Sequence, residues 1–437
     1  MRHHLSLLSL LLVLLLAAAV RAHYYQEQAR QHPPFSHITY DAFGYYLYLP
    51  GALLYGDITS ADWIEPVHQA YRVKGGDWLY QTIQQPDGRH VGKYLGGVAL
   101  LQLPFFALAH AAAGWGGFPQ DGFSLPYQWG IIGAAFFYAF LGLWVLRRFL
   151  LAYFDERSTA LTLLLTGLAT NWVQYVAVDG AQSHIYIFPL YALVLWLTKR
   201  WHERPSASLA FGIGAIIGLA TICRPTEAIM LFIPLLWGTQ DATSSRGKWA
   251  LVRAHRAQVA WAALGGLLAI LPQLVYWKHA TGHFIFDVGS KWHFLNPWLR
   301  VLFGFEKGWF VYTPVTVFFV LGLAFLKGQP FRRSVWVFCA LNLWIITAWA
   351  DWRYGGSYST RALVQSYPVF ALGLAALLQR VLHTRWRAWA LAVAAYLLFV
   401  NLFQVYQYNA GILRYDENSF EYYRSIYLNP AAQPYPR

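Results

Sequence analysis

The chain has 437 residues, of which 57% are hydrophobic, 18% are aromatic and only 12% are charged. Soluble domains carry about 25% charged residues, so this composition excludes an ordinary soluble protein and indicates one that crosses a membrane several times. The net charge of +13 does not indicate a nucleic-acid partner, because the basic residues stand in short clusters between apolar runs and form no continuous basic face. Cys223 and Cys339 lie in apolar segments, so we expect small buried hydrophobes rather than a disulfide or metal pair.

The N-terminal apolar run, residues 5–20, is long enough for a marginal membrane span. Residues 1–22 could instead be a cleaved signal peptide, because Val20-Arg21-Ala22 resembles a small-residue cleavage site. Both interpretations place the chain after this point outside the cytoplasm. We expect a retained helix, because further apolar segments rather than a secreted domain follow it.

Residues 23–128 are expected to form a long first external loop that contains interfacial helices. Its apolar segment 94–113 is interrupted by Gly96-Gly97 and by Pro104. If this segment crossed the bilayer, Arg147-Arg148 and the basic loops after it would face outside. Because cytoplasmic loops carry the excess of Lys and Arg, we expect segment 94–113 to lie in the outer interface.

The remaining apolar segments alternate between the two sides and bring the total to about eleven spans. They are residues 129–146, 161–176, 185–197, 209–222, 228–237, 259–276, 310–326, 335–349, 363–378 and 388–406. They leave a second long external loop at 278–308 and an external C-terminal tail at 407–437. The sequence therefore predicts an all-α polytopic membrane protein in which residues 1–437 form a single membrane domain.

Polar residues gather on the expected outer side of the membrane. Asp41 opens an aromatic run that contains Tyr45 and Tyr46, and a carboxylate there indicates a polar site at the depth of the lipid head groups. The alternative is that Asp41 only caps a short helix that begins at Ala42. The other candidates on this side are Lys93, Asp179, His184, Arg224, Glu227, Arg353 and Arg361. Ionisable residues near membrane depth are costly, which makes them candidates for function.

Each of these candidates also has a purely structural interpretation. A lone Arg can snorkel to the interface, although Arg224 and Arg353 fall on the side that the positive-inside rule leaves poor in basic residues. Asp179 and His184 could be a metal pair, but a third ligand is missing, and His184 could equally tie two helices through a polar turn. The aromatic loops could form an interfacial belt or stack on sugar rings.

In these motifs the chain resembles the GT-C superfamily of membrane glycosyltransferases, especially bacterial relatives of protein O-mannosyltransferases and of the lipid A aminoarabinose transferase. The motifs are Tyr40-Asp41-Ala-Phe-Gly-Tyr-Tyr46, Gly92-Lys93-Tyr94, Asp179 in the next external loop, and Trp349-Ala-Asp-Trp-Arg-Tyr-Gly-Gly-Ser-Tyr-Ser-Thr-Arg361. The chain departs from the mannosyltransferases where their Asp-Glu pair is Asp41-Ala42, which argues against a protein acceptor. It also has Lys93-Tyr94-Leu95 where many relatives have Lys-Pro or Lys-Tyr-Pro.

The resemblance implies a multi-pass protein of the bacterial inner membrane that takes a polyprenyl-phosphate sugar as donor and works on the periplasmic face. Asp41 would deprotonate a hydroxyl of a lipid, glycan or protein acceptor, Lys93 would hold the donor phosphate, and Asp179 would position the acceptor or a divalent metal (Mg, Mn or Zn). To these we add, from charge and sidedness, Arg224, Arg353 and Arg361 as cations for the phosphate. The remaining candidates, as acceptor, sugar or structural contacts, are Tyr45, Tyr46, His184 and Glu227.

This inventory is consistent with an inverting transfer. A lipid-phosphate sugar already carries its leaving group, so no nucleotide site is needed, and one carboxylate suffices as general base. A transporter or flippase for a lipid-linked or anionic substrate is the alternative, but its charges should line a path near the midplane. The expected spans are almost free of charge in their middles, which favours a surface site. A non-catalytic protein that binds a lipid-linked sugar is a further alternative.

Overall fold

The computed structural model describes residues 4–29 and 36–435, and it is almost entirely helical. The α-helices are, in chain order, α1 (His4–Ala29), α2 (Asp41–Tyr46), α3 (Tyr48–Leu53), α4 (Ile64–Tyr71), α5 (Gly97–Trp115), α6 (Leu125–Leu151), α7 (Glu156–Leu168), α8 (Trp172–Ala177), α9 (Ser183–Glu203), α10 (Ala207–Cys223), α11 (Phe232–Leu236), α12 (Ala242–Ala254), α13 (Arg256–Thr281), α14 (Arg300–Phe303), α15 (Trp309–Tyr312), α16 (Val315–Gly322), α17 (Arg332–Ala348), α18 (Tyr367–Val381), α19 (Arg387–Asn409) and α20 (Phe420–Ile426). Three 3₁₀ segments join them: η1 (Pro225–Leu231), η2 (Leu323–Phe325) and η3 (Arg361–Ser366). Interpretations that fall on residues 1–3, 30–35 and 436–437 lie outside the described residues.

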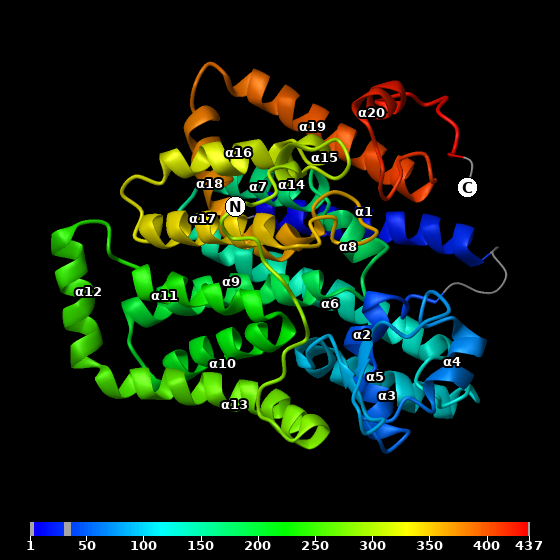
Figure 1. The fold of residues 1–437 in the computed structure, drawn as a ribbon. Coiled ribbons are helices and arrows are strands. Elements are labelled where there is room, and N and C mark those ends of the chain that lie inside the picture. Colours follow the sequence, from blue (N-terminus) through cyan, green and yellow to red (C-terminus); the bar gives the residue numbers. More distant parts are fainter. Residues whose placement is uncertain (1–3, 30–35, 436–437) are drawn as a thin grey trace.

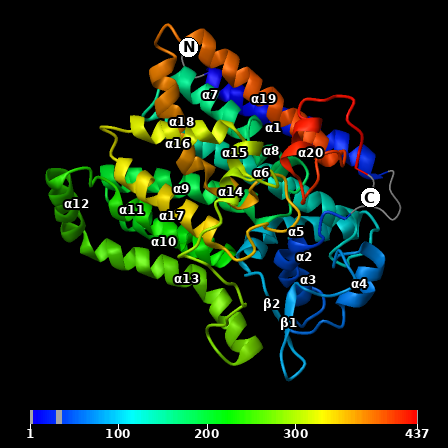
Figure 2. The same ribbon diagram turned by 45° about the horizontal axis from the view of Figure 1, so that its top comes forward.

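The long helices run roughly side by side, and α12 crosses them at one end of the bundle (Figure 1). A lobe of short elements, α2 to α4 with the start of α5, covers the other end (Figures 1 and 2). This lobe also holds an antiparallel hairpin of β1 (Thr82–Gln84) and β2 (His90–Gly92). The hairpin is the exception to the all-α prediction.

Six of the described helices are long and apolar enough to cross a membrane, and they identify a multi-pass membrane protein. They are His4–Gln26, Gly97–Trp115, Leu125–Leu151, Arg256–Thr281, Arg361–Val381 and Arg387–Asn409. Each of the eleven expected spans coincides with a helix or with consecutive short helices, but the number eleven is not confirmed, because several of them are short or broken. Segment 94–113, expected in the interface, becomes α5, whose length and composition allow it to cross.

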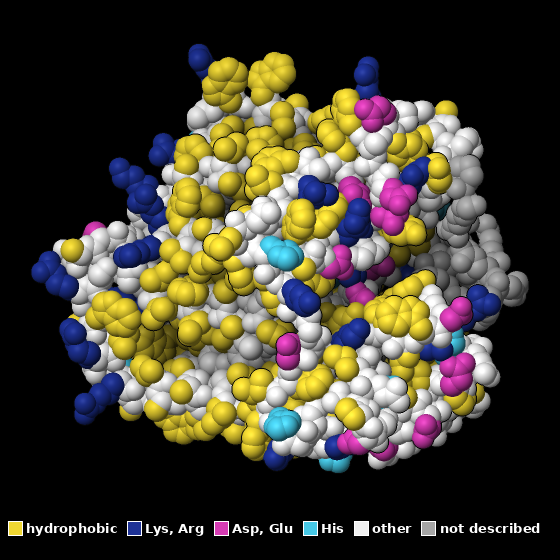
Figure 3. Space-filling model, in the orientation of Figure 1, with side chains coloured by type: hydrophobic (Ala, Val, Ile, Leu, Met, Phe, Trp, Pro, Cys, Tyr) yellow, Lys and Arg dark blue, Asp and Glu magenta, His cyan; other side chains and the backbone are white. Residues whose placement is uncertain are grey.

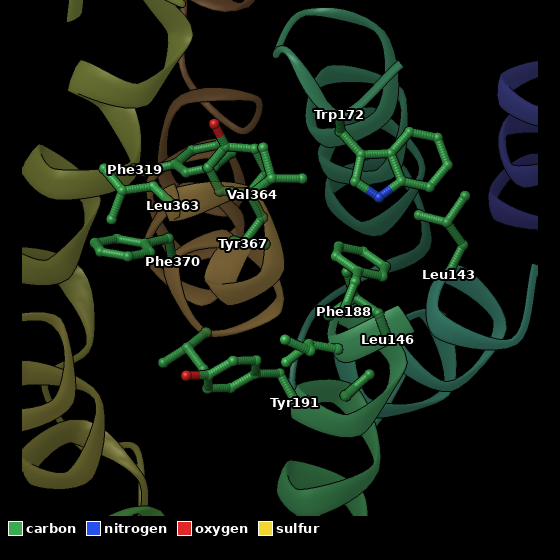
Figure 4. Packing of buried hydrophobic residues seen from close by; sticks show 14 of the residues in the cluster. Leu143, Leu146, Trp172, Phe188, Tyr191, Phe319, Leu363, Val364, Tyr367 and Phe370 are labelled. Atoms are coloured by element: carbon green, nitrogen blue, oxygen red, sulfur yellow. The ribbon is translucent and has the colours of Figure 1, made fainter. Parts of the chain in front are cut away.

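The core of the bundle lies between helices that are distant in the sequence. Leu143 and Leu146 of α6 and Phe188 of α9 face Tyr367 and Phe370 of α18 across this core (Figure 4). Within the apolar stretch that begins at η3 and continues into α18, 89% of the residues are buried, whereas only 11% are buried in the corresponding stretch of α13. The η3–α18 helix is therefore central, and α13 is an outer helix.

Small residues bring α10 and α13 into backbone contact. A Cβ atom on Gly214 would overlap the carbonyl oxygen of Ala262, and one on Gly265 would overlap that of Phe211. Glycines allow this close approach between membrane helices because no side chain separates the backbones. The two helices consequently form one rigid pair.

Candidate active site

A polar cavity of about 180 Å³ lies between the lobe and the helix ends beneath it. Its lining residues are Asp41, Tyr45, Lys93, Tyr94, Gln182, His184, Arg224, Val288, Ser290, Trp349, Tyr354 and Arg361. Six of the ten candidates chosen from the sequence belong to this set: Asp41, Tyr45, Lys93, His184, Arg224 and Arg361. Segments more than 300 residues apart in the chain thus meet at one place.

The Asp41 carboxylate is held by three side chains. The hydroxyl groups of Tyr80 and Tyr94 donate to Oδ1 at 2.9 Å and 2.5 Å, and Nη2 of Arg361 lies 2.5 Å from Oδ2. Helix α2 begins at Asp41 itself, and the residue before it, Tyr40, makes no side-chain cap. The capping alternative is therefore wrong, and the carboxylate faces the cavity instead of its own helix.

The charge of Asp41 follows from these contacts. Burial raises the pKa of Asp41, but the charge of Arg361 and the hydrogen bonds from Tyr94, Tyr80 and Arg361 outweigh burial, so the pKa lies below its ordinary value. Asp41 is consequently ionised at neutral pH. While it is paired in this way, it is also a weaker base than a free aspartate.

The glycine in the aromatic run makes room for one of these partners. A Cβ atom on Gly44 would overlap the ring of Tyr94, so the absence of a side chain lets that ring lie on α2. Tyr45 packs edge-to-face on Tyr94 at a centroid distance of 4.7 Å. Tyr46 points elsewhere: its hydroxyl group donates to the carbonyl oxygen of Gly122 at 2.5 Å. Tyr46 is thus a structural residue of the lobe and does not line the cavity.

Lys93 enters the cavity from the segment between β2 and α5. The neighbouring backbone is tied to α13, because Gly92 donates to the hydroxyl of Tyr276 at 2.9 Å and Gly96 donates to Oε1 of Gln273 at 2.8 Å. Within residues 4–29 and 36–435, the Lys93 ammonium has no hydrogen-bond or ion-pair partner. It is a cation that faces the cavity and is available to an anionic ligand.

Arg224 caps the end of α10 and brings a second guanidinium to the cavity. Its Nη1 lies 3.4 Å from Nδ1 of His184, and that nitrogen lies 2.8 Å from Oε1 of Gln365. Nδ1 of His184 therefore carries the proton that it donates to Gln365, which leaves Nε2 as an acceptor.

Glu227 stands behind this group. It is buried, accepts a hydrogen bond from Nε2 of Gln365 at 3.1 Å, and accepts another from the hydroxyl of Tyr191. Glu227 therefore orients Gln365, and through it His184, and does not reach the cavity itself.

Asp179 also lies outside the cavity lining. Its carboxylate accepts a hydrogen bond from Nε2 of Gln174 at 3.0 Å, and Gln174 is bonded in turn to Asn409 of α19. Burial raises the pKa of Asp179, and the Gln174 hydrogen bond and the charge of Arg361 oppose this only in part. Among the described residues no group of three or more His, Cys, Asp and Glu side chains is placed to hold a metal ion, so His184 and Asp179 acquire no third ligand.

Arg353 is not brought to the cavity. Its Nε lies 2.6 Å from Oε1 of Glu306, and about half of its side chain is exposed. The neighbouring cation, Lys307, is buried and donates to the carbonyl oxygens of Arg353 and Gly355. Lys307 thereby fixes the loop that carries Tyr354 and Arg361.

A wider cavity of about 330 Å³ continues from the polar one and shares Lys93, Arg224 and Tyr354 with it. Its further walls are mostly apolar and include Cys223 of α10, Trp277 of α13, and Ile345 and Ile346 of α17, with Pro225 of η1. Asp287 of the second long loop and Thr226 are polar exceptions in this lining. The second long loop crosses it, because Trp292 forms an isolated β-bridge with Trp349. The site is thus a polar chamber joined to an apolar extension between helices.

The sequence interpretation missed several residues of this site. Tyr94, Trp349 and Tyr354 stand inside the motifs quoted for the resemblance, and that position was the signal that could have selected them. Tyr80 and Gln365 carry no such signal, because their roles depend on contacts with residues 39 and 181 positions away.

Comparison with known proteins gives little further information. No protein-family model matches the chain, and no curated protein matches it at the threshold of significance. Among solved structures, the chain is similar to the crystal structure of ArnT from Cupriavidus metallidurans in the apo state, with 13% sequence identity and a TM-score of 0.49. The match covers 88% of this chain, which spans only 62% of the length of that one.

Proposed function

We propose that the protein is a GT-C-type glycosyltransferase that moves a sugar from a polyprenyl-phosphate donor to a hydroxyl acceptor. The observation that carries this proposal is the polar cavity, in which Lys93, Arg224 and Arg361 surround the single carboxylate of Asp41. An excess of cations at one carboxylate suits a ligand that is anionic and that also needs a base. The order of the motifs in the sequence supports the same class.

The cations account for the phosphate of the donor. Guanidinium groups bind phosphate oxygens through paired N–H donors, and an ammonium acts as a compact point charge. Fixed positive groups at the scissile bond stabilise the charge that develops on the departing phosphate. The mostly apolar cavity that opens between the ends of α10 and α17 would receive the first isoprene units of the lipid.

The reaction is a single displacement at the anomeric carbon. Asp41 accepts the proton of the acceptor hydroxyl, the acceptor oxygen forms the new bond to that carbon, and the bond to the phosphate oxygen breaks. The polyprenyl phosphate leaves with the electron pair, and the anomeric configuration inverts. General base catalysis of this kind contributes roughly 10²–10⁴ in rate.

Binding of the donor would also activate the base. Arg361 holds Asp41 as a weak base, and a donor phosphate beside Lys93 and Arg224 competes for the same guanidinium. Once Arg361 turns to the phosphate, burial raises the pKa of Asp41 towards the range in which a carboxylate abstracts a proton efficiently.

The charge distribution supports a site on the external face of the inner membrane. On the face shown in Figure 3, Lys and Arg side chains gather around the end that carries α12, and most acidic side chains lie towards the other end. Excess Lys and Arg mark the cytoplasmic side. Because Asp41 belongs to the lobe at the end opposite α12 (Figure 1), the cavity would open to the periplasm.

The experiment that tests this function is transfer of labelled sugar from a panel of polyprenyl-phosphate sugars, in membranes that supply acceptors. Wild type and the control variant Arg353→Ala should consume one donor, because Arg353 lies outside the cavity, and Asp41→Asn should be slower by roughly 10²–10⁴. Full activity of folded Asp41→Asn would refute the assignment of the base. If folded wild type consumes no donor, the protein is not this enzyme, and the transporter or binding protein takes its place.

A further inference from the structure

A cavity of about 440 Å³ is larger than the two cavities that Lys93 and Arg224 line, and it shares no lining residue with either. It is a groove along α10 from Ala210 to Thr221, which is about 16 Å at 1.5 Å per residue. Its walls are mostly apolar, and Figure 3 shows it as a hollow lined by hydrophobic side chains in the region framed by α11, α12 and α13.

The groove opens beside the outer surface of the bundle. Its α13 wall belongs to a helix whose membrane window is only 11% buried, and Val259 and Ala263 on that wall are exposed. An exposed apolar rim on a membrane helix faces hydrocarbon, so a lipid chain can enter from the side.

One end of the groove holds a buried ammonium. Nζ of Lys248 lies 2.6 Å from Nε2 of His202 and donates to the carbonyl oxygen of Pro234 at 2.7 Å. An ammonium has three N–H donors, so one remains for a ligand. The ring of Trp201 faces the same Lys248 nitrogen, which lies 5.6 Å from the ring centroid.

The surface around this end is strongly basic. Exposed guanidinium groups on the adjoining ends of α9, α12 and α13 are those of Arg200, Arg204, Arg246, Arg253 and Arg256. The acids on these segments are already engaged: Glu203 pairs with Lys199 at 2.5 Å, and Asp241 caps the start of α12. The rim therefore has a net positive charge that is complementary to an anionic lipid head group.

We propose that this groove binds one acyl chain of an anionic phospholipid, with the phosphate at Lys248 and the basic rim. The bound lipid fills the space under α12 and joins that helix to α10, α11 and α13. The occupant is distinct from the sugar donor, because it enters at the opposite end of the bundle and shares no residue with the cavity at Asp41. Its test is therefore independent of the proposed activity.

The test uses the purified full chain and native mass spectrometry, with phosphatidylglycerol compared with phosphatidylcholine of the same acyl chains. Each basic residue near an anionic head group contributes about fivefold in affinity, so we expect phosphatidylglycerol to bind about five- to thirtyfold more tightly. Ala263→Trp should abolish this binding by filling the groove. Ala260→Trp places the same ring on an exposed position of α13 outside the groove lining and should bind as wild type does.

The head-group contact is tested separately by Lys248→Met, with Arg385→Met as the control, because Arg385 is an exposed arginine before α19 that belongs neither to the groove lining nor to the basic rim. Lys248→Met should lose the preference for phosphatidylglycerol. Equal binding of phosphatidylglycerol by wild type and Ala263→Trp would overturn the proposal, and so would equal affinity of wild type for the two lipids. If Lys248→Met does not fold, the comparison of Ala263→Trp with Ala260→Trp still decides whether the groove is the site.

Discussion

Asp41→Asn removes one negative charge from the cavity and keeps nearly the same shape. The Asn oxygen can still accept hydrogen bonds from Tyr80 and Tyr94, but Arg361 loses its ion partner. The variant should therefore bind the sugar-free lipid product, polyprenyl phosphate, more tightly than wild type does, although it transfers sugar roughly 10²–10⁴ more slowly. A residue with a merely structural role would not produce this opposite pair of effects.

The size of the gain follows from the geometry. A phosphate that shares Arg361 with Asp41, whose carboxylate now lies 2.5 Å from the guanidinium, would lie about 5 Å from that carboxylate. Two unit charges repel by roughly 3 kcal/mol at that distance for an effective dielectric constant of 20. Because the two side chains keep 18% and 13% of their surface in contact with solvent, we halve this value. The remaining ~1.5 kcal/mol corresponds to about tenfold in affinity.

The assay is titration of the purified protein in nanodiscs with polyprenyl phosphate. Tyr80→Phe is the matched control, because it removes a hydrogen bond to Asp41 but leaves the charge, and its affinity should stay within about threefold of wild type. Equal or weaker binding of polyprenyl phosphate by Asp41→Asn would refute the view that Asp41 and the donor phosphate compete for Arg361.

Two further predictions concern residues that shape the cavity. Gly44→Ala should displace the Tyr94 ring and lower transfer at least about tenfold in a folded protein, whereas Gly133→Ala, where an added Cβ meets nothing within 4 Å, should leave transfer unchanged; equal activity of the two variants contradicts the role given to Tyr94. Burial lowers the pKa of Lys307 to about 8, and the positive charge of Arg361 contributes to this lowering. Between pH 8 and about 10.5 the unfolded chain therefore binds more protons than the folded protein does. The free energy of unfolding consequently rises with pH across this window, by at most about 3 kcal/mol. Lys307→Met should abolish this rise in thermal unfolding scans, and an unchanged slope would exclude Lys307 as its source.

Sequence patterns selected several residues that the structure brings to one cavity. Asp41, Lys93, Arg224 and Arg361 were selected because charges at the outer ends of apolar segments are costly, and the structure gathers all four around one cavity. Apolar segments likewise located the helices, because their length and hydropathy depend on local composition. The Pro86-Asp87-Gly88 turn between short polar segments was a signal for the hairpin that the interpretation did not use.

Local sequence patterns could not predict the contacts between segments that are distant in the chain. Arg353 and Arg361 share one loop and carry the same signal, yet only Arg361 enters the cavity. Their different fates depend on the loop conformation, in which Lys307 binds two carbonyl groups and Tyr354 has a φ of 54°. The break in the expected span 310–326 falls at Thr313-Pro314, where the proline disfavours a helical conformation of the residue before it, and the interpretation did not use this signal. The break in the expected span 161–176 lies at residues 169–171, which contain neither Gly nor Pro.

The glycine contacts between α10 and α13 determine how far apart two cations of the cavity, Lys93 and Arg224, are held. Arg224 is the residue that ends α10. The backbone on both sides of Lys93 is hydrogen-bonded to Tyr276 and Gln273 of α13. Because the two backbones touch, neither helix can roll or slide without the other, and the separation of the two cations is fixed from within the bilayer and not by flexible loops. The α10–α13 pair thus sets the distance between Lys93 and Arg224, and this distance limits the size of the anion that can bind between the two cations.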